Sequence, residues 1–306
     1  MRFVTFNEGG RTRAGVLTGQ ADDDSAEQGE VLDLAHPDFA DCLRGVAPDL
    51  LEMVSAGLDP IARRIAALGQ PPASACLPLQ TVQLLAPLPN PPRIVGAAHN
   101  YACALKERGV PAPKAPVLFE KSALTVIGPG ATVILPEGAG GITYEAELAV
   151  VIGRRAKEIT PQEAMEFVAG YTLFNDISAS EIIRADGSFD RGKNFPTFGP
   201  MGPWLATPDE VNPSGGHRVT LEVDGVYRQD GTTADLLFGV AELISRLSHA
   251  SALEPGTVIA TGTPAGVAPV QTPPTWLEPG TVMTVAIEGL GQLVNPVENG
   301  RSVNVG

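Results

Sequence analysis

Residues 142–153, ITYEAELAVVIG, read as a β-strand that enters a hydrophobic core. The second half of the stretch is apolar, from Leu148 to Ile152, while two carboxylates, Glu145 and Glu147, lie at its head. Successive side chains of a strand alternate between its faces, so the two glutamates project to one side, roughly 7 Å apart. Because ionised carboxylates are costly to bury unpaired, the pattern indicates either a solvated strand end or two ligands of one divalent cation.

A third acid occupies a similar position in residues 171–179, YTLFNDISA. Asn175 and Asp176 follow a short apolar strand there, although such a pair could equally form a turn or a cap. Three carboxylates at neighbouring strand ends would suit Mg²⁺, Mn²⁺ or Ca²⁺, because hard cations prefer oxygen ligands. No histidine is near these acids in the sequence, which disfavours zinc or iron. From the residues alone, a metal site and a solvated surface both stay open.

The composition excludes several classes of protein. The chain has 306 residues, of which 43% are hydrophobic, enough for a large globular core. It contains no run of about 18 apolar residues that would cross a membrane, and because its first residues include no apolar stretch we expect no secretory signal. A formal net charge of −14 makes nucleic acids and membranes unfavourable partners, and an anionic substrate would need a local cation. Three cysteines without CxxC spacing argue against disulfides, so we expect a cytoplasmic protein.

A Pro-rich stretch suggests how the chain is divided. Residues 1–75 combine short strand patterns with helical patterns that stop at Gly57 and Gly69, and we expect a small N-terminal α+β domain there. Residues 76–93 contain the proline cluster and read as a linker. Residues 94–306 would form the main domain, which is rich in β-branched strand patterns. The sequence therefore predicts an α+β, strand-rich fold.

Local signals in the main domain predict individual elements. The Asp224-Gly225 pair between two strand patterns predicts a hairpin. Thr160 and Glu163 form a capping-box pattern that predicts a helix over residues 160–170. Leucine, isoleucine and valine at helical spacing predict a second helix over residues 234–249.

Four segments together carry a family resemblance. They are YEAELAVVIG, VAGYTLFNDISA, GKNFPTFGPMGPWL and LEPGTVIATGTPAGVA, and in this order they resemble successive motifs of the fumarylacetoacetate hydrolase family. The resemblance covers about residues 90–300. It implies a mixed β-sandwich roll as the C-terminal domain, with a smaller N-terminal domain in many members. It also implies a homodimeric enzyme of aromatic catabolism that acts on a small keto acid or diketone.

The same resemblance implies roles for single residues. It makes Glu145, Glu147 and Asp176 the ligands of a divalent metal, Mg²⁺ or Mn²⁺, with Ca²⁺ as a further possibility. Lys193, in RGKNF, matches a family lysine beside the metal and the substrate, where it would neutralise an enolate or carboxylate oxygen.

Three further residues would bind substrate by the same comparison. Thr263 and Gly262 belong to TGTPAGV, which matches a loop at the wall of the family's pocket, and Thr263 would offer its hydroxyl or backbone amide to a carboxylate. A tight Gly/Pro turn without a ligand is the alternative. Gln229, in VYRQDGTT, matches a hairpin glutamine near that pocket.

Residues 97–121 resemble the family's mobile lid and the strand after it. In many hydrolytic members this lid carries a histidine and, three residues later, a glutamate, which together activate water. The glutamate position holds Glu107, but the histidine position holds Ala104. His99 is a second catalytic candidate, with a loop histidine at the rim of the pocket as the alternative. Half of the expected dyad is therefore missing.

Two reactions stay open. The metal and Lys193 would stabilise the enolate of a chelated 2-oxo acid or β-dicarbonyl. With Glu107 as general base, water would then cleave a C–C bond of an acylpyruvate-like or β-diketone substrate, which is the first hypothesis. The alternative is an isomerase, decarboxylase or dehydratase acting on a 2-oxo or 2-hydroxydienoate acid. Ala104 favours this alternative, as does Ser180, which replaces an arginine that relatives often carry. A non-catalytic binding protein is a third hypothesis, which the complete carboxylate set opposes.

Overall fold

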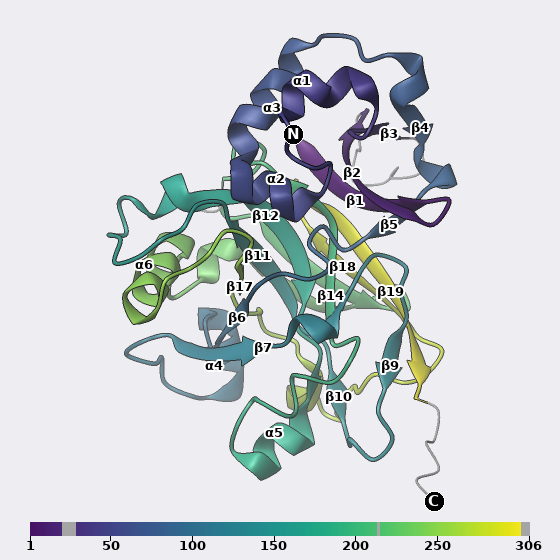
Figure 1. The fold of residues 1–306 in the computed structure, drawn as a ribbon. Helices are drawn as coiled ribbons and strands as arrows, with labels where there is room; N and C mark the ends of the chain where they lie inside the picture. Colours follow the sequence, from purple (N-terminus) through teal and green to yellow (C-terminus); the bar gives the residue numbers. More distant parts are fainter. Residues whose placement is uncertain (20–28, 213–214, 301–306) are drawn as a thin grey trace, which may run out of the picture.

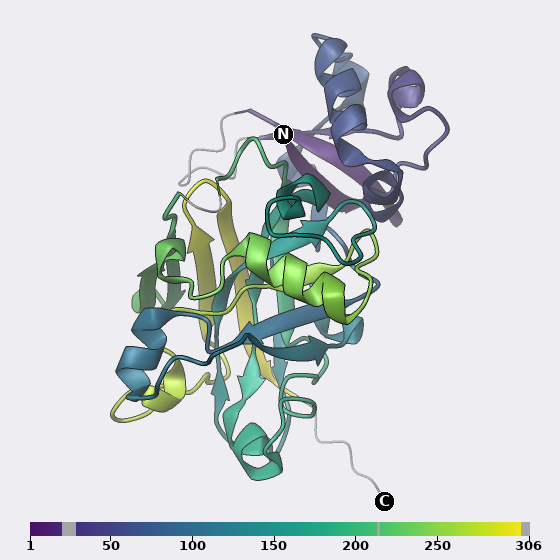
Figure 2. The same ribbon diagram turned by 90° about the vertical axis from the view of Figure 1, so that its left-hand side faces the viewer.

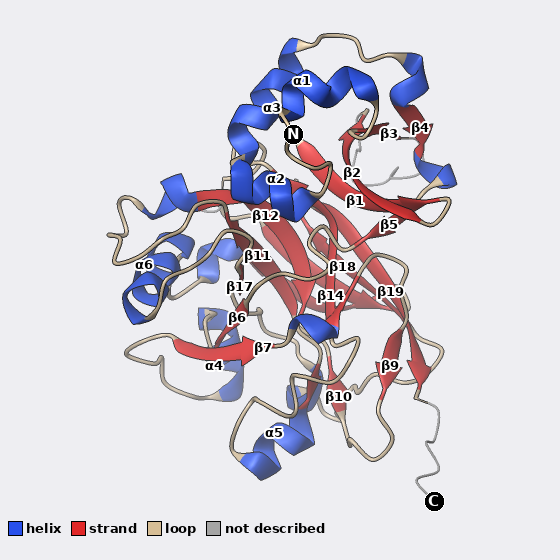
Figure 3. Ribbon diagram, in the orientation of Figure 1, coloured by secondary structure: helices blue, strands red, loops and turns tan. Residues whose placement is uncertain are grey.

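The computed structural model describes residues 1–19, 29–212 and 215–300, and it is built mainly of β-strands (Figure 3). Two large sheets and several short helices make up these residues. The predicted α+β, strand-rich class is therefore confirmed. None of the described helices is both long and apolar enough to cross a membrane.

A mixed sheet of 12 strands runs through the centre of the molecule (Figure 1). Its strands are β1 (Arg2–Glu8), β2 (Arg11–Thr18), β3 (Glu30–Asp33), β4 (Cys76–Pro78), β5 (Gln83–Leu85), β6 (Ile94–Ala98), β7 (Val117–Lys121), β8 (Val126–Ile127), β11 (Ala146–Ile152), β12 (Val168–Asn175), β14 (Gly199–Ala206) and β17 (Val258–Ala260). The order is β4-β3-β2-β1-β14-β12-β11-β17-β6-β7, while β5 pairs with β1 and β8 with β14. Residues 142–153, predicted as one strand, are divided: residues 146–152 form the central strand β11, β10 (Ile142–Thr143) belongs to a small separate sheet, and Tyr144 and Glu145 lie between the two strands.

A second sheet packs against the first. It contains β16 (Val226–Thr232), β15 (Arg218–Val223), β18 (Val282–Ile287), β19 (Gly291–Asn299) and β9 (Val133–Leu135), in that order. One continuous core joins Leu148 and Val150 of β11 to Leu221 of β15 and Val285 of β18. This sheet-on-sheet packing is the predicted β-sandwich. The predicted hairpin is also confirmed, since Asp224 and Gly225 both have positive φ between β15 and β16.

Strand β11 is buried on both faces. Its even-numbered residues Leu148 and Val150 belong to the core between the sheets. Its odd-numbered residues Ala149 and Val151 belong to a second core that also includes Leu50. Because side chains alternate, Glu147 faces the side that carries Ala149 and not the sandwich core.

The N-terminal part carries three helices, α1 (Ala40–Leu43), α2 (Leu50–Ala56) and α3 (Leu58–Ala67), which lie beside β1 to β3 (Figures 1 and 2). Residues 76–93 include β4 and β5, which pair with β3 and β1. Strand β1 also pairs with β14 of the main body. The main sheet therefore continues across the Pro-rich stretch, and the division into residues 1–75, 76–93 and 94–306 stays a proposal.

Three more helices belong to the main body, namely α4 (Ala102–Arg108), α5 (Ser180–Asp186) and α6 (Val240–Ala250). The helix predicted over residues 234–249 begins later, at Val240. The prediction of a helix over residues 160–170 is wrong. Glu163 does accept the capping hydrogen bonds from Thr160, but only a short 3-10 helix follows, Ala164–Phe167. Strand β12 takes up the remaining residues because it pairs with both β11 and β14.

Candidate active site

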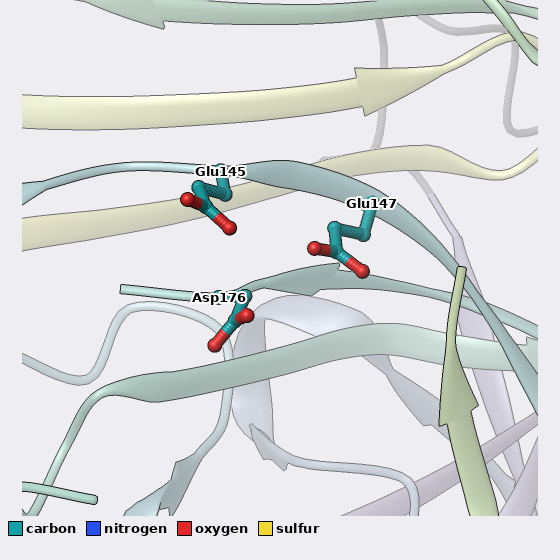
Figure 4. Close-up of side chains that lie close together, drawn as sticks. All are labelled: Glu145, Glu147 and Asp176. Carbon is teal, nitrogen blue, oxygen red and sulfur yellow. The ribbon is translucent and has the colours of Figure 1, made fainter. Parts of the chain in front are cut away.

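Antiparallel pairing brings three carboxylates together. The head of β11 lies beside the end of β12, with Ala146 opposite Asn175. The small sheet of β10 (Ile142–Thr143) and β13 (Ser178–Ala179) continues the same pairing beyond both strands. One carboxylate oxygen from each of Glu145, Glu147 and Asp176 therefore lies within 4.8 Å of the others, and the three side chains point toward one another (Figure 4).

Backbone hydrogen bonds hold these segments in place. The Asn175 side-chain oxygen accepts from the Glu145 amide at 3.0 Å, and the Asp176 amide donates to the Glu145 carbonyl at 2.9 Å. The amide of Gly262 donates to the Glu147 carboxylate at 2.7 Å. Gly262 has φ of +99° and packs against Asn100, so a side chain at this position would be strained and crowded. The predicted Gly262 thus contacts a candidate metal ligand directly.

Two buried lysines complete the cluster. Lys193 Nζ donates to Glu145 at 2.8 Å and also to Asp176. Lys121 Nζ donates to the other Asp176 oxygen at 2.8 Å and to the Lys193 carbonyl at 2.6 Å. The Lys193 ammonium also lies over the ring of Phe119, 4.7 Å from its centroid. The structure therefore places Lys193 among the three acids, and its role beside a metal and a substrate stays a prediction.

Lys121 also belongs to the site, although the sequence motifs did not predict it as a site residue. The signal was present, because in β7 Phe119 and Lys121 share the buried face while Leu118 and Glu120 are exposed. A lysine on the buried face of a strand needs a partner of opposite charge. Nothing in the sequence identified Asp176 as that partner, since 55 residues separate them.

Burial and neighbouring charges give the carboxylates different proton affinities. Burial raises the pKa of Glu147 well above its ordinary value, and the negative charges of Asp176 and Glu145 add to this effect. Burial also acts to raise the pKa of Asp176, but Lys121 and Lys193 outweigh it, and the net shift is downward. For Lys193, the acids outweigh burial and raise its pKa. Glu147 is therefore the group that most needs a further cation to stay ionised.

The residues present fit a divalent metal ion. Three converging carboxylates supply the hard oxygen ligands that Mg²⁺, Mn²⁺ and Ca²⁺ prefer. Two of them, Glu147 and Asp176, are almost completely buried, with 2% and 0% exposure, so bulk water cannot screen their mutual repulsion.

Gln229 and Thr263 hold the peptide between the two glutamates. Gln229 Oε1 accepts from the Ala146 amide at 2.9 Å, and Thr263 Oγ1 donates to the Ala146 carbonyl at 2.9 Å. The Gln229 side-chain amide also donates to Thr263 Oγ1 at 2.8 Å, so Gln229, Thr263 and Ala146 are linked pairwise by hydrogen bonds. The Thr263 hydroxyl thus donates its proton to Ala146, the residue between Glu145 and Glu147. Substrate binding by Gln229 and Thr263 stays a prediction.

We expect Thr263→Val to weaken Mn²⁺ binding roughly 10–100-fold, the range typical of residues that orient metal ligands. Valine has nearly the shape of threonine but cannot bond to Ala146, so the two glutamates would lose their fixed spacing. Isothermal titration calorimetry checks this, with Thr263→Ser as the matched variant that keeps the hydroxyl and binds like the wild type. Equal affinities of the valine and serine variants would contradict the role.

The lid residues lie on and around helix α4. Glu107 Oε2 accepts from the Gly266 amide at 3.0 Å, which joins α4 to the loop that carries Gly262 and Thr263. His99 precedes the helix with φ of +58°, and its Nδ1 lies 3.1 Å from Arg108 Nη1. Partial burial, then Arg108 and Lys193, lower the pKa of His99. Ala104, at the position of the expected histidine, is buried and offers no titratable group.

Comparison with known proteins shows that the segments which carry these residues lie within one family match. The family model described as "Fumarylacetoacetate (FAA) hydrolase C-terminal" matches residues 93–298. A protein of Burkholderia orbicola (strain MC0-3), named "Putative hydrolase", is 36% identical, and the match covers 98% of this chain and 99% of the relative.

Solved structures extend the likeness to the fold. A fumarylacetoacetate hydrolase from the psychrophile Exiguobacterium antarcticum superposes with a TM-score of 0.80 and 31% identity, covering 98% of this chain and 100% of that one. A 5-carboxymethyl-2-hydroxymuconate delta-isomerase from Mycobacterium smegmatis superposes with a TM-score of 0.76 and 30% identity, covering 99% and 100%. Hydrolases and isomerases thus share this architecture.

Proposed function

This chain belongs to the fumarylacetoacetate hydrolase family, and from that premise we propose that it is a divalent-metal-dependent hydrolase. Its substrate would be acylpyruvate-like or a β-diketone, cleaved at a C–C bond. The observation that carries the proposal is the buried cluster of Glu145, Glu147 and Asp176 with Lys193 among them. We further propose Mg²⁺ or Mn²⁺ as the cation and a cytoplasmic homodimer as the working form.

The chain's own residues would divide the work as follows. Glu145, Glu147 and Asp176 would hold the cation, which as a Lewis acid supplies polarisation of the substrate carbonyls. Lys193 Nζ, buried between two of these acids, would donate to an enolate or carboxylate oxygen. The side chain of Lys193 is only 3% exposed, so its charge acts with little screening by solvent.

Glu107 is the proposed general base. It lies on α4, and its carboxylate contacts the amide of Gly266, next to the loop that bonds to Glu147. That hydrogen bond fixes the position of the Glu107 carboxylate, which would accept a proton from water. His99 is the second candidate, and partial burial, then Arg108 and Lys193, lower its pKa and so favour its neutral ring.

We expect Glu107→Gln to lower kcat roughly 100–10,000-fold, the usual contribution of a general base, without changing metal affinity. Glutamine can still accept from Gly266, so the helix keeps its position. Steady-state kinetics with an acylpyruvate and calorimetry with Mn²⁺ separate the two effects. A matched exposed variant on the same helix, Lys106→Gln, should retain full activity. An unaffected rate in Glu107→Gln would transfer the role of base to His99.

One specific observation favours a second candidate function. Ala104 leaves α4 without a histidine, and one of the similar solved structures is a delta-isomerase. With a proton shuttle but no activated water, the same carboxylate cluster would support isomerisation, decarboxylation or dehydration of a 2-oxo or 2-hydroxydienoate acid.

Product analysis in ¹⁸O water separates the two candidates. The Mg²⁺- or Mn²⁺-loaded protein is incubated with acylpyruvates, fumarylpyruvate, oxaloacetate and 2-hydroxydienoates, and the products are identified by mass. We expect ¹⁸O in a product carboxylate, which marks hydrolysis. Release of CO₂, or an isomer of unchanged mass, would reject the hydrolase in favour of the alternative.

A further inference from the structure

A cleft lies between the N-terminal helices and the main sheet, away from the candidate active site (Figure 1). Its volume is about 1150 Å³. One wall consists of the end of α2 and the first turns of α3, within residues 55–66. The opposite wall includes residues 153–155, which follow β11, and Val168 and Ala169, which begin β12. None of the active-site residues described above lines this cleft, which therefore has no part in the proposed reaction.

Strands β11 and β12 separate the cleft from the three carboxylates. Glu147 is the second residue of β11, whereas Gly153, just after the last residue of this strand, lines the cleft. Strand β12 runs the opposite way, from Val168 in the cleft to Asn175, the neighbour of Asp176. Six residues of a strand span about 20 Å, so a small molecule in the cleft would not contact the acids.

Contacts on two sides fix the walls of the cleft relative to each other. The Thr207 amide donates to the Met1 carbonyl at 2.9 Å, and both residues line the cleft. On another side, Gly256 lies so close to Leu51 of α2 that a Cβ at Gly256 would be 2.3 Å from Leu51 Cδ1. The pairing of β1 with β14 joins the same two parts of the chain. The cleft is thus a preformed concavity, as small-molecule sites usually are.

Most of the lining is apolar. Leu58, Ala62 and Ala66 contribute from α3, and Ala169 and Pro255 from the main body. Leu58 and Ala169 are buried, whereas Ala66 is exposed. Such a lining favours an occupant with an apolar body, because covering apolar surface removes it from water.

Two neighbouring arginines give the cleft a positively charged side. Arg154 donates twice to the carbonyl of Glu166, while the Glu166 carboxylate lies 3.6 Å from the guanidinium. Arg155 donates to Glu254, a residue outside the lining, at 2.9 Å. A guanidinium has five N–H groups, so both arginines keep donors for a ligand. Both ion pairs are exposed and therefore weak, and a ligand carboxylate would compete with them.

The acids of the lining do not oppose an anion there. Each of the three already has a cation: Asp59 pairs with Arg63, Glu166 with Arg154, and Asp209 with the Met1 ammonium. An anion beside Arg155 would therefore not meet an unpaired carboxylate of the lining. In a chain whose net charge is −14, this cleft combines three arginines with an apolar wall.

We propose that this cleft is a second ligand site of the protein. It binds a small organic acid whose carboxylate pairs with Arg154 and Arg155 and whose apolar body lies against α3. Arginine suits the task because its planar guanidinium binds a carboxylate through two parallel hydrogen bonds. The site is independent of the proposed reaction, since it needs neither a metal nor the three buried acids.

Matched acids and amides test the assignment on metal-free protein, in which the carboxylate cluster has no cation to hold a ligand carboxylate. Calorimetry compares octanoate with octanamide, and 3-phenylpropanoate with 3-phenylpropanamide. We expect at least one acid to bind roughly 10–100-fold more tightly than its amide, because charge-assisted hydrogen bonds typically contribute this much. The acid that binds more tightly shows whether the apolar body is a straight chain or an aromatic ring.

Two kinds of variant locate the binding. The double variant Arg154→Gln and Arg155→Gln should weaken the preferred acid roughly 10–100-fold and leave its amide within about 2-fold. Ala66→Trp should fill the cleft and weaken the acid by more than about 10-fold, since the apolar body would lose its place.

Matched controls bind like the wild type if the assignment is right. Arg218→Gln removes an exposed arginine far from the cleft lining, and Ala67→Trp changes the next exposed residue of α3, which does not line the cleft. No binding of either acid, equal affinity for acid and amide, or an acid affinity unchanged in Ala66→Trp would each overturn the assignment. Because the measurement involves no turnover, its result does not depend on the proposed hydrolase.

Discussion

Glu147→Gln is expected to weaken Mg²⁺ or Mn²⁺ binding by more than about 100-fold and to abolish turnover. Even residues that only orient metal ligands typically contribute about 10–100-fold, and Glu147 is itself one of the three candidate ligands. It is 2% exposed, so water cannot take its place at the cation. Glutamine keeps the size of the side chain and an oxygen that can accept from Gly262, which isolates the loss of charge.

The same variant has a distinct pH signature. Because burial and its acidic neighbours raise the pKa of Glu147, the metal-free protein keeps a proton there up to a higher pH than an ordinary glutamate does, and below that pH a cation must displace the proton. Metal affinity should therefore rise with pH. A carboxyl whose pKa is raised by folding stabilises the folded state at low pH, and this contribution is lost as pH rises through the raised pKa. Glu147→Gln should remove that pH-dependent loss from the metal-free protein.

Calorimetry in buffers of different ionisation enthalpy measures both the affinity and the protons released. The control is Glu137→Gln, which removes an exposed glutamate outside the cluster and should bind metal like the wild type. Unchanged affinity in Glu147→Gln would remove the central claim of a metal site at this strand. Unchanged proton release would instead assign the displaced proton to another group.

Lys121→Met is expected to lower the free energy of unfolding of the metal-free protein by about 3–5 kcal/mol, the cost of leaving a buried charge without its partner. The side chains of Lys121 and Asp176 are each 1% exposed, and the lysine also donates to the carbonyls of Ile177 and Lys193. Methionine fills the space but leaves Asp176 with a single cation and those carbonyls without this donor. Saturating Mg²⁺ should recover part of the loss, because a bound cation compensates the same carboxylate.

Urea unfolding, followed with and without Mg²⁺, checks the size of this effect. The control is Lys114→Met, which removes an exposed lysine nearby in the sequence and should stay within about 0.5 kcal/mol of the wild type. If Lys121→Met were no more destabilising than Lys114→Met, Lys121 would not be the counter-ion of Asp176.

Much of the fold could be predicted from local patterns. The apolar run from Leu148 to Ile152 identified a buried strand, and the Asp224-Gly225 pair identified a hairpin, because each depends on the residues themselves. The prediction of a helix over residues 160–170 was wrong because non-local strand pairing decides the structure there. Its capping bonds form, yet pairing of β12 with two neighbouring strands outweighs the local preference for a helix.

Some residues of the candidate site could likewise be found from the sequence, whereas others could not. Glu145 and Glu147 could be found as a pair from their spacing in the sequence, but only Glu147 lies on β11, and hydrogen bonds to Asn175 and Asp176 hold Glu145 just before the strand. The ion pair of Lys121 with Asp176 and the hydrogen bonds of Gln229 and Thr263 to Ala146 could not be found in this way, because the partners are distant in the chain.

The sequence by itself determined which strand carries the acids, which way they face and which motifs follow one another. Only the tertiary structure decided that Asp176 meets the two glutamates, that two lysines neutralise the cluster, and that Glu107 lies against Gly266. The physical reason is the range of the interactions. Alternation and turn chemistry act between neighbours in the chain, whereas charge balance in a buried site depends on groups that only sheet pairing brings within a few ångströms.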